Sequence, residues 1–139
     1  METLKCDKKN MRIWVKALRS GKFKQGRGAL HTIETTDEQT FCCLGVACEV
    51  AIANGLKLET GRANFDSRFV SYDDSINYLP KPVQAFLQLD NYDPIISEDI
   101  SAIEANDSYN WSFGKIADEL ERTYGLTSVP WYKRMFKWK

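Results

Sequence analysis

A basic segment that contains glycines lies at residues 21–28 and is the first candidate for chemistry. Its cations are Lys22, Lys24 and Arg27, and Gln25 adds a neutral hydrogen-bonding amide. Glycine lets main-chain N–H groups approach a phosphate closely, and lysine and arginine supply the matching positive charge. The segment lacks the Gly-Lys-Ser/Thr ending of a Walker loop. We expect it to bind an anion; the alternative is an exposed connector between two elements.

A second candidate lies far along the chain, at Asn106-Asp107-Ser108. Asparagine and aspartate side chains in a loop can receive sugar hydroxyls or base edges, but they also form local turns before a helix. Two aromatic residues, Tyr109 and Trp111, follow in the same polar stretch, where a ring could stack on a base. We therefore include Asn106, Asp107, Tyr109 and Trp111 in the predicted ligand site. The alternative is that the segment forms a local turn and that the two rings pack on the domain to anchor it.

Three thiols and one histidine are candidates for a metal or catalytic site. Cys42, Cys43 and Cys48 lie in one apolar run, and His31 is the only histidine. The spacing is wrong for a Cys-x-x-Cys zinc site, so we predict no metal and no cofactor. A cysteine nucleophile would need a base, and a Cys–His pair across a hairpin stays open. We assign no catalytic residue and expect buried, reduced thiols in a reducing compartment.

Adjacent acids occur at Asp73-Asp74, Glu98-Asp99 and Asp118-Glu119. Hydrolases that use two carboxylates need them to converge at a defined separation. Neighbours in sequence point apart on a strand or around a helix, so we interpret these pairs as turns and helix faces. These carboxylates assign no reaction to the protein, and we favour binding over catalysis.

The elements that must position these residues follow from apolar spacing and from turn residues. Hairpins are predicted from strands 29–34 and 40–43 and from strands 68–72 and 75–78. Helices are predicted over residues 11–19, 44–54, 79–89, 98–105, 113–124 and 131–138. The pattern indicates an α+β fold, a small antiparallel sheet of two hairpins flanked by several short helices.

Length and composition indicate one ordinary domain over residues 1–139, with basic residues 1–10 and the basic, aromatic residues 130–139 peripheral to it. No apolar stretch is long enough to span a membrane, and the first ten residues lack the apolar core of a secretory signal. We therefore expect a cytoplasmic protein that makes no contact with a membrane.

The net charge is zero, but the charges are segregated. Residues 1–27 and 131–139 are strongly basic, whereas residues 28–130 are strongly acidic. Basic ends favour an anionic partner, and direct binding of nucleic acid through these ends is one interpretation. An acidic surface that binds and inhibits another protein is a second. In a third interpretation, the two basic ends pack against the acidic central part of the same chain.

Several segments in order resemble a family of small, mostly uncharacterised phage and prophage proteins. The most specific is the block Cys42-Cys43-Leu44-Gly45-Val46, and another is Ser112-Phe113 followed by Ile116-Ala117-Asp118. The resemblance also includes segments 14–21, 23–30, 79–83 and 106–107. It implies an accessory role in the cytoplasm of an infected bacterium, and names no reaction.

Together these observations predict a phage protein that counters host defence by binding and sequestering a small phosphorylated, nucleotide-like ligand without catalysis. Lys22, Lys24 and Arg27 would contact phosphates. Inhibition of a host defence protein is the alternative, and nucleic-acid binding the third possibility. A symmetric homo-oligomer is one alternative for the assembly of this protein, because such oligomers are common among soluble proteins.

Overall fold

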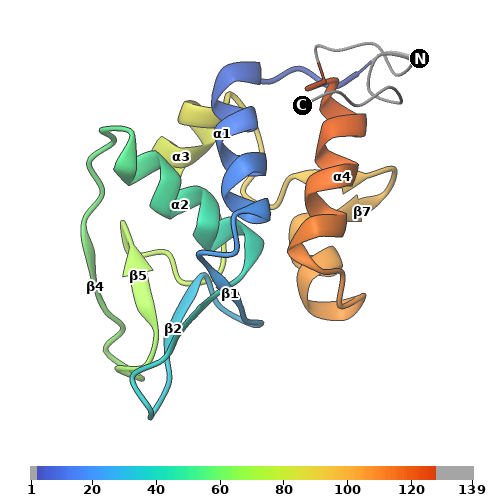
Figure 1. The fold of residues 1–139 in the computed structure, drawn as a ribbon. Helices are drawn as coiled ribbons and strands as arrows, with labels where there is room; N and C mark the ends of the chain where they lie inside the picture. The colour runs from blue at the N-terminus through green and yellow to red at the C-terminus, as the bar shows by residue number, and fades with distance from the viewer. Residues whose placement is uncertain (1–2, 128–139) are drawn as a thin grey trace.

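The structure, a computed structural model, describes residues 3–127 and has an α+β fold, as predicted. Figure 1 shows the α-helices in its upper part and the strands β1, β2, β4 and β5 below them. The elements, in chain order, are α1 (Lys8–Arg19), β1 (Lys24–Gln25), β2 (His31–Ile33), β3 (Gln39–Phe41), α2 (Cys43–Ala53), β4 (Thr60–Arg62), β5 (Val70–Tyr72), α3 (Lys81–Leu87), β6 (Ile95–Ser97), β7 (Ile100–Ser101), the π-helical turn η1 (Glu104–Ser108) and α4 (Phe113–Tyr124).

Helix α1 begins at a capping aspartate and buries one face. The Asp7 side chain accepts a hydrogen bond from the main-chain N–H of Asn10, as an N-cap residue does. Met11, Trp14 and Leu18 recur at helical spacing and are buried against α2 and α4. Trp14 Nε1–H also donates to the carbonyl of Cys43 at 2.9 Å, which fixes α1 to the first turn of α2.

Helix α2 is apolar apart from Glu49 and lies at the centre of the core. Cys43, Leu44, Val46 and Ala47 are all buried. A helix that is apolar all round must be enclosed, and α2 contacts α1, α3 and strand β3. Gly45 is a glycine because a Cβ there would lie 1.7 Å from the carbonyl oxygen of Leu30.

The first predicted hairpin is confirmed: β2 pairs with β3 in antiparallel fashion. Strand β1 joins the other side of β3 in parallel orientation, so the sheet order is β1-β3-β2. A single bridge from Thr32 to Phe69 links this sheet to the pair β4–β5. The pairing of β1 with β3 places the middle of the basic segment at the opposite edge of this sheet from β2.

The partner of strand β5 differs from the prediction. Residues 75–78 were expected to pair with it, but β5 pairs with β4, and only one bridge joins Tyr72 to Ser75. Asp73 and Asp74 both have positive φ, which turns the chain sharply after β5. The carbonyl of Ile76 then accepts from the N–H of Leu30, so this segment lies against the start of β2.

Most of the predicted helices within the described residues are present, and two of them, α1 and α4, begin at a side-chain cap. The helices predicted over 11–19, 44–54 and 113–124 appear as α1, α2 and α4, and that over 79–89 as the shorter α3. The helix predicted over 98–105 is wrong in its first part, where Ile100–Ser101 form strand β7 in a third hairpin with β6. The helical residues begin at Ala102 and lead into η1. The helix predicted over 131–138 lies outside the described residues. None of the described helices has the length and apolarity to cross a lipid bilayer.

Candidate functional site

The two predicted ligand segments lie side by side, and one buried amide joins them. Asn106 is completely buried in η1. Its Oδ1 accepts from Gln25 Nε2 at 2.8 Å and from the main-chain N–H of Cys43 at 3.2 Å. Its Nδ2 donates to the carbonyl of Gly26 and to Asp107 Oδ1, each at 2.8 Å. Asn106 therefore ties β1, α2 and η1 together.

Asp107 is the predicted site residue that faces a pocket. The pocket has a volume of about 250 Å³ and lies where the basic segment, the first turn of α2 and η1 meet. The Asp107 carboxylate lies near the α2 N-terminus, whose N–H groups favour negative charge. The pocket is lined by Gly28, Ala29, Cys42, Cys43, Leu44, Asn77, Tyr78, Ala102, Ile103 and Asp107.

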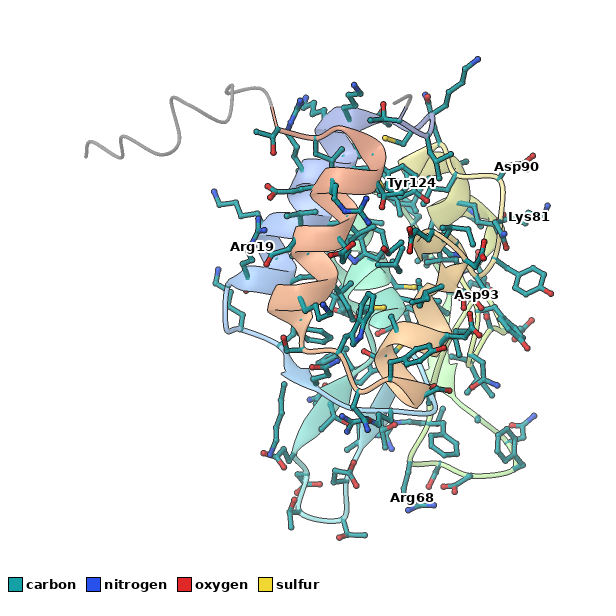
Figure 2. The ribbon with its side chains drawn as sticks, turned by 90° about the vertical axis from the view of Figure 1, so that its right-hand side faces the viewer. Arg19, Arg68, Lys81, Asp90, Asp93 and Tyr124 are labelled. Carbon is teal, nitrogen blue, oxygen red and sulfur yellow. The ribbon has the colours of Figure 1, made fainter. Side chains whose placement is uncertain are left out.

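A π-helical turn carries both Asn106 and Asp107. Single π-helical turns are rare and are frequent at functional sites. Asp93 accepts from the main-chain N–H of Ile103 at 2.9 Å and so holds the start of this turn. In Figure 2, Asp93 lies on the opposite side of the view from Arg19 of α1. The turn thus presents Asp107 from an anchored main chain.

None of the three predicted cations lines the pocket. Lys24 Nζ lies 2.7 Å from Glu38 Oε2, and both side chains are about half exposed, so the pair contributes little stability. Lys22 and Arg27 are exposed and form no ion pair with a described residue. Arg27 directly precedes Gly28, which lines the pocket.

The aromatic residues of the second segment lie beside η1 and outside the pocket lining. Tyr109 is 56% exposed, and its ring centre lies 6.3 Å from that of Trp111. Trp111 is half-buried, its carbonyl accepts from Gln25 Nε2, and Lys115 Nζ lies 4.6 Å from its ring centre. Lys115 thus covers the ring in a cation–π contact.

The thiols near the pocket are buried and hard to ionise. Burial raises the pKa of Cys42 to about 12, and this outweighs the N–H groups of Leu44 and Gly45, which lower it. Burial also raises the pKa of Cys43 and Cys48 well above the ordinary value. Since the thiolate is the nucleophile, these cysteines have the character of core residues. Among the described residues, no group of three His, Cys, Asp or Glu side chains converges for a metal ion.

His31 belongs to a hydrogen-bond chain that contains no thiol. Tyr72 Oη donates to Glu49 Oε2 at 2.6 Å, so it accepts from His31 Nδ1, which lies 2.7 Å away. His31 Nε2 lies 2.7 Å from Gln39 Oε1, and a neutral ring needs this amide to turn its NH₂ group inward. Both ring nitrogens are thereby engaged, and neither contacts a thiol.

The stability of the protein is expected to fall when the pH drops below 6.5. Burial lowers the pKa of His31 from its ordinary value of 6.5, more than Gln39 and Glu49 raise it. The unfolded chain therefore binds a proton at a higher pH than the folded chain, and each unit of difference costs about 1.4 kcal/mol. Urea unfolding between about pH 5 and pH 7 measures the slope.

The variant His31→Gln is the control for this slope, because the chain has one histidine. It is expected to be less stable than the natural protein but to lose the pH dependence over the same interval. A natural protein whose free energy of unfolding is constant across that interval contradicts the prediction.

Two of the three adjacent pairs of acids, at residues 73–74 and 118–119, make local contacts. Asp118 and Glu121 both contact Arg19, and Glu119 pairs with Arg122. Asp73 Oδ1 accepts from the main-chain N–H of Glu59. These contacts agree with the interpretation of the pairs as turns and helix faces.

The range of α1 through α4 coincides with a known family domain. The model of DUF8296, a domain of unknown function, matches residues 7–124. The chain belongs to this family. In this DUF8296 protein the match begins at Asp7, the cap of α1, and ends at Tyr124, the last residue of α4. No curated protein and no solved structure matches the chain.

Sequence reasoning missed several residues at the DUF8296 pocket. Asn77, Tyr78 and the first turn of α2 line it, together with Gly28 of the predicted segment. The signal that points to α2 is the strand that ends at Phe41, directly before a helix, because helix N-termini present free N–H groups. Nothing local in the sequence places Asn77 and Tyr78 beside that turn.

Proposed function

We propose that this domain binds a small phosphorylated, nucleotide-like ligand and sequesters it without catalysis. The observation that carries the proposal is the pocket at the start of α2, into which a carboxylate held by a buried amide is directed. A pocket of about 250 Å³ is smaller than those that enclose drug-sized molecules, so it takes one end of the ligand. The sugar or base enters, and the phosphate stays outside.

The phosphate is assigned to the rim, where the basic segment enters the pocket. Gly28 lines the pocket, and Arg27 and Lys22 are exposed cations close to it in the chain. Lys24 joins them when its exposed pair with Glu38 opens. Phosphate contacts to such cations are charge-assisted, and the segment supplies them without any catalytic group. Asn106 and Gln25 hold the pocket in shape, and Tyr109 and Trp111 lie beyond it.

A phage anti-defence role in the cytoplasm of an infected bacterium is part of the proposal. It is supported by the resemblance of the Cys42–Val46 block to phage proteins. Buried thiols with raised pKa values, a histidine engaged at both nitrogens and locally paired acids favour binding over chemistry. In that role the domain lowers the concentration of a free nucleotide signal.

Calorimetry with a panel of linear and cyclic nucleotides tests the proposal. The double variant Lys22→Ala, Arg27→Ala is expected to weaken binding at least about tenfold, because each charged contact contributes about 1.5–3 kcal/mol. Lys57→Ala is the matched control, since Lys57 is exposed and does not line the pocket. Its affinity is expected to equal that of the natural protein.

Two results would redirect the assignment. A folded sample that gives no heat with any nucleotide, but retains one host protein, supports inhibition through the acidic surface. Binding to DNA or RNA whose affinity falls steeply with salt supports contact through the basic ends. Either result, without nucleotide binding, contradicts sequestration.

A further inference from the structure

The pocket at the start of α2 carries one charged side chain among the described residues, that of Asp107. The other polar side chains that line it are the amide of Asn77 and the hydroxyl of Tyr78. A phosphate in this pocket would meet a carboxylate, and like charges repel. The pocket therefore accepts the end of the ligand that carries hydrogen-bond donors, which deepens the function proposed above and rests on it.

The Asp107 carboxylate is an acceptor that is partly used and firmly held. Its Oδ1 accepts from Asn106 Nδ2 at 2.8 Å, and no described residue donates to its Oδ2. A carboxylate has about four acceptor positions across its two oxygens, so it can take two further donors side by side. Because Asn106 is completely buried, the direction of this carboxylate is set before a ligand arrives.

Two adjacent donors on one edge are rare among nucleobases. Guanine presents N1–H and an N2 amino group side by side. Adenine and cytosine each present one amino group next to a bare ring nitrogen, and uracil presents one N–H between two carbonyls. A bare nitrogen or a carbonyl facing a carboxylate is repelled, because both are acceptors. We propose that the pocket selects guanine, whose N1–H and N2–H donate to the two oxygens of Asp107.

The remaining lining suits a flat ring. Ala29, Ala102 and Ile103 supply apolar surface, and Tyr78 is 47% exposed at the pocket. The Tyr78 ring is braced edge-on against Tyr92, with ring centres 4.6 Å apart. An exposed, braced aromatic ring is a stacking surface for a base. With the base held here, the sugar and phosphate lead out past Gly28 toward Arg27.

Calorimetry with four 5′-monophosphates and with inosine monophosphate tests the assignment. The natural protein is expected to bind guanosine monophosphate at least about tenfold more tightly than the adenosine, cytidine and uridine forms. Inosine monophosphate lacks the N2 amino group and is expected to bind several-fold more weakly than the guanosine form. This comparison needs no variant, so it holds even where a substitution harms folding.

Asp107→Asn is the decisive variant, because an amide can face guanine with only one acceptor. It is expected to reduce the guanosine-to-adenosine preference to about twofold or less, while Asp74→Asn, outside the pocket, keeps it. Equal binding of all the bases, or a preference that survives Asp107→Asn, overturns the guanine assignment and leaves nucleotide binding in place. The absence of binding to any nucleotide overturns both.

Discussion

Replacement of Asn106 by alanine is expected to lower the free energy of unfolding by about 3–5 kcal/mol. Four hydrogen bonds meet at this amide, and the side chain is completely buried. Alanine leaves the carbonyl of Gly26 and the N–H of Cys43 without these partners and leaves a cavity. The buried backbone groups cannot rotate to bond water instead, so the loss in free energy of unfolding is large. Urea unfolding measures this loss.

Two further variants make this result specific. Asn64→Ala is the matched control, because Asn64 is exposed, and it is expected to change stability by less than about 0.5 kcal/mol. Asn106→Asp keeps the shape but places a second carboxylate beside Asp107 and the carbonyl of Gly26. It is expected to be at least as unstable as the alanine variant. If the Asn106→Ala protein is as stable as the Asn64→Ala protein, the four hydrogen bonds of Asn106 do not stabilise the fold as expected.

Gly45→Ala is expected to destabilise the protein by about 3 kcal/mol or more. The added Cβ would lie 1.7 Å from the carbonyl oxygen of Leu30 and 2.7 Å from its carbonyl carbon. Backbone atoms cannot move aside as a side chain can, and this carbonyl also accepts from the N–H of Cys42. Helix α2 must therefore shift away from β2, which disturbs the first turn that lines the pocket. Thermal and urea unfolding measure the effect.

Gly114→Ala in α4 separates this clash from helix propensity. The nearest atom to its added Cβ is Ser112 Oγ, at 3.8 Å, so no contact is violated. Alanine is the better helix former, and the variant is expected to gain up to about 1 kcal/mol. If Gly45→Ala behaves like Gly114→Ala, the close approach of α2 to Leu30 is not present in solution.

The sequence allowed prediction of elements whose signals are local. Helix α4 follows from a serine cap, a periodic apolar stripe and Gly125, and the structure has these bounds. The partner of β5 did not follow, because strand pairing depends on where the chain returns in space. The tight turn at Asp73 and Asp74 looks like a hairpin turn in sequence, but it sends the chain to Leu30.

The candidate site shows the same division between local and distant information. Residue type singled out Gln25, Asn106 and Asp107, and the structure joins these two segments, which are 81 residues apart. The residue type alone does not distinguish a ligand-binding role from a structural one, because an amide that binds a ligand and an amide that holds a loop have the same atoms. Burial decides between them, and it depends on the packing of η1 against β1 and α2.

The hydrogen bond between Gln25 and Asn106 also constrains the order in which the domain folds. During synthesis, β1, the first hairpin and α2 leave the ribosome before η1 does. Until η1 follows, the carbonyl of Gly26 and the N-terminus of α2 lack their hydrogen bonds to Asn106. Contacts between distant segments carry a larger closure entropy and form late. The ligand capture that we propose would therefore begin only when the last third of the domain has been synthesised, and a chain truncated before η1 would lack it.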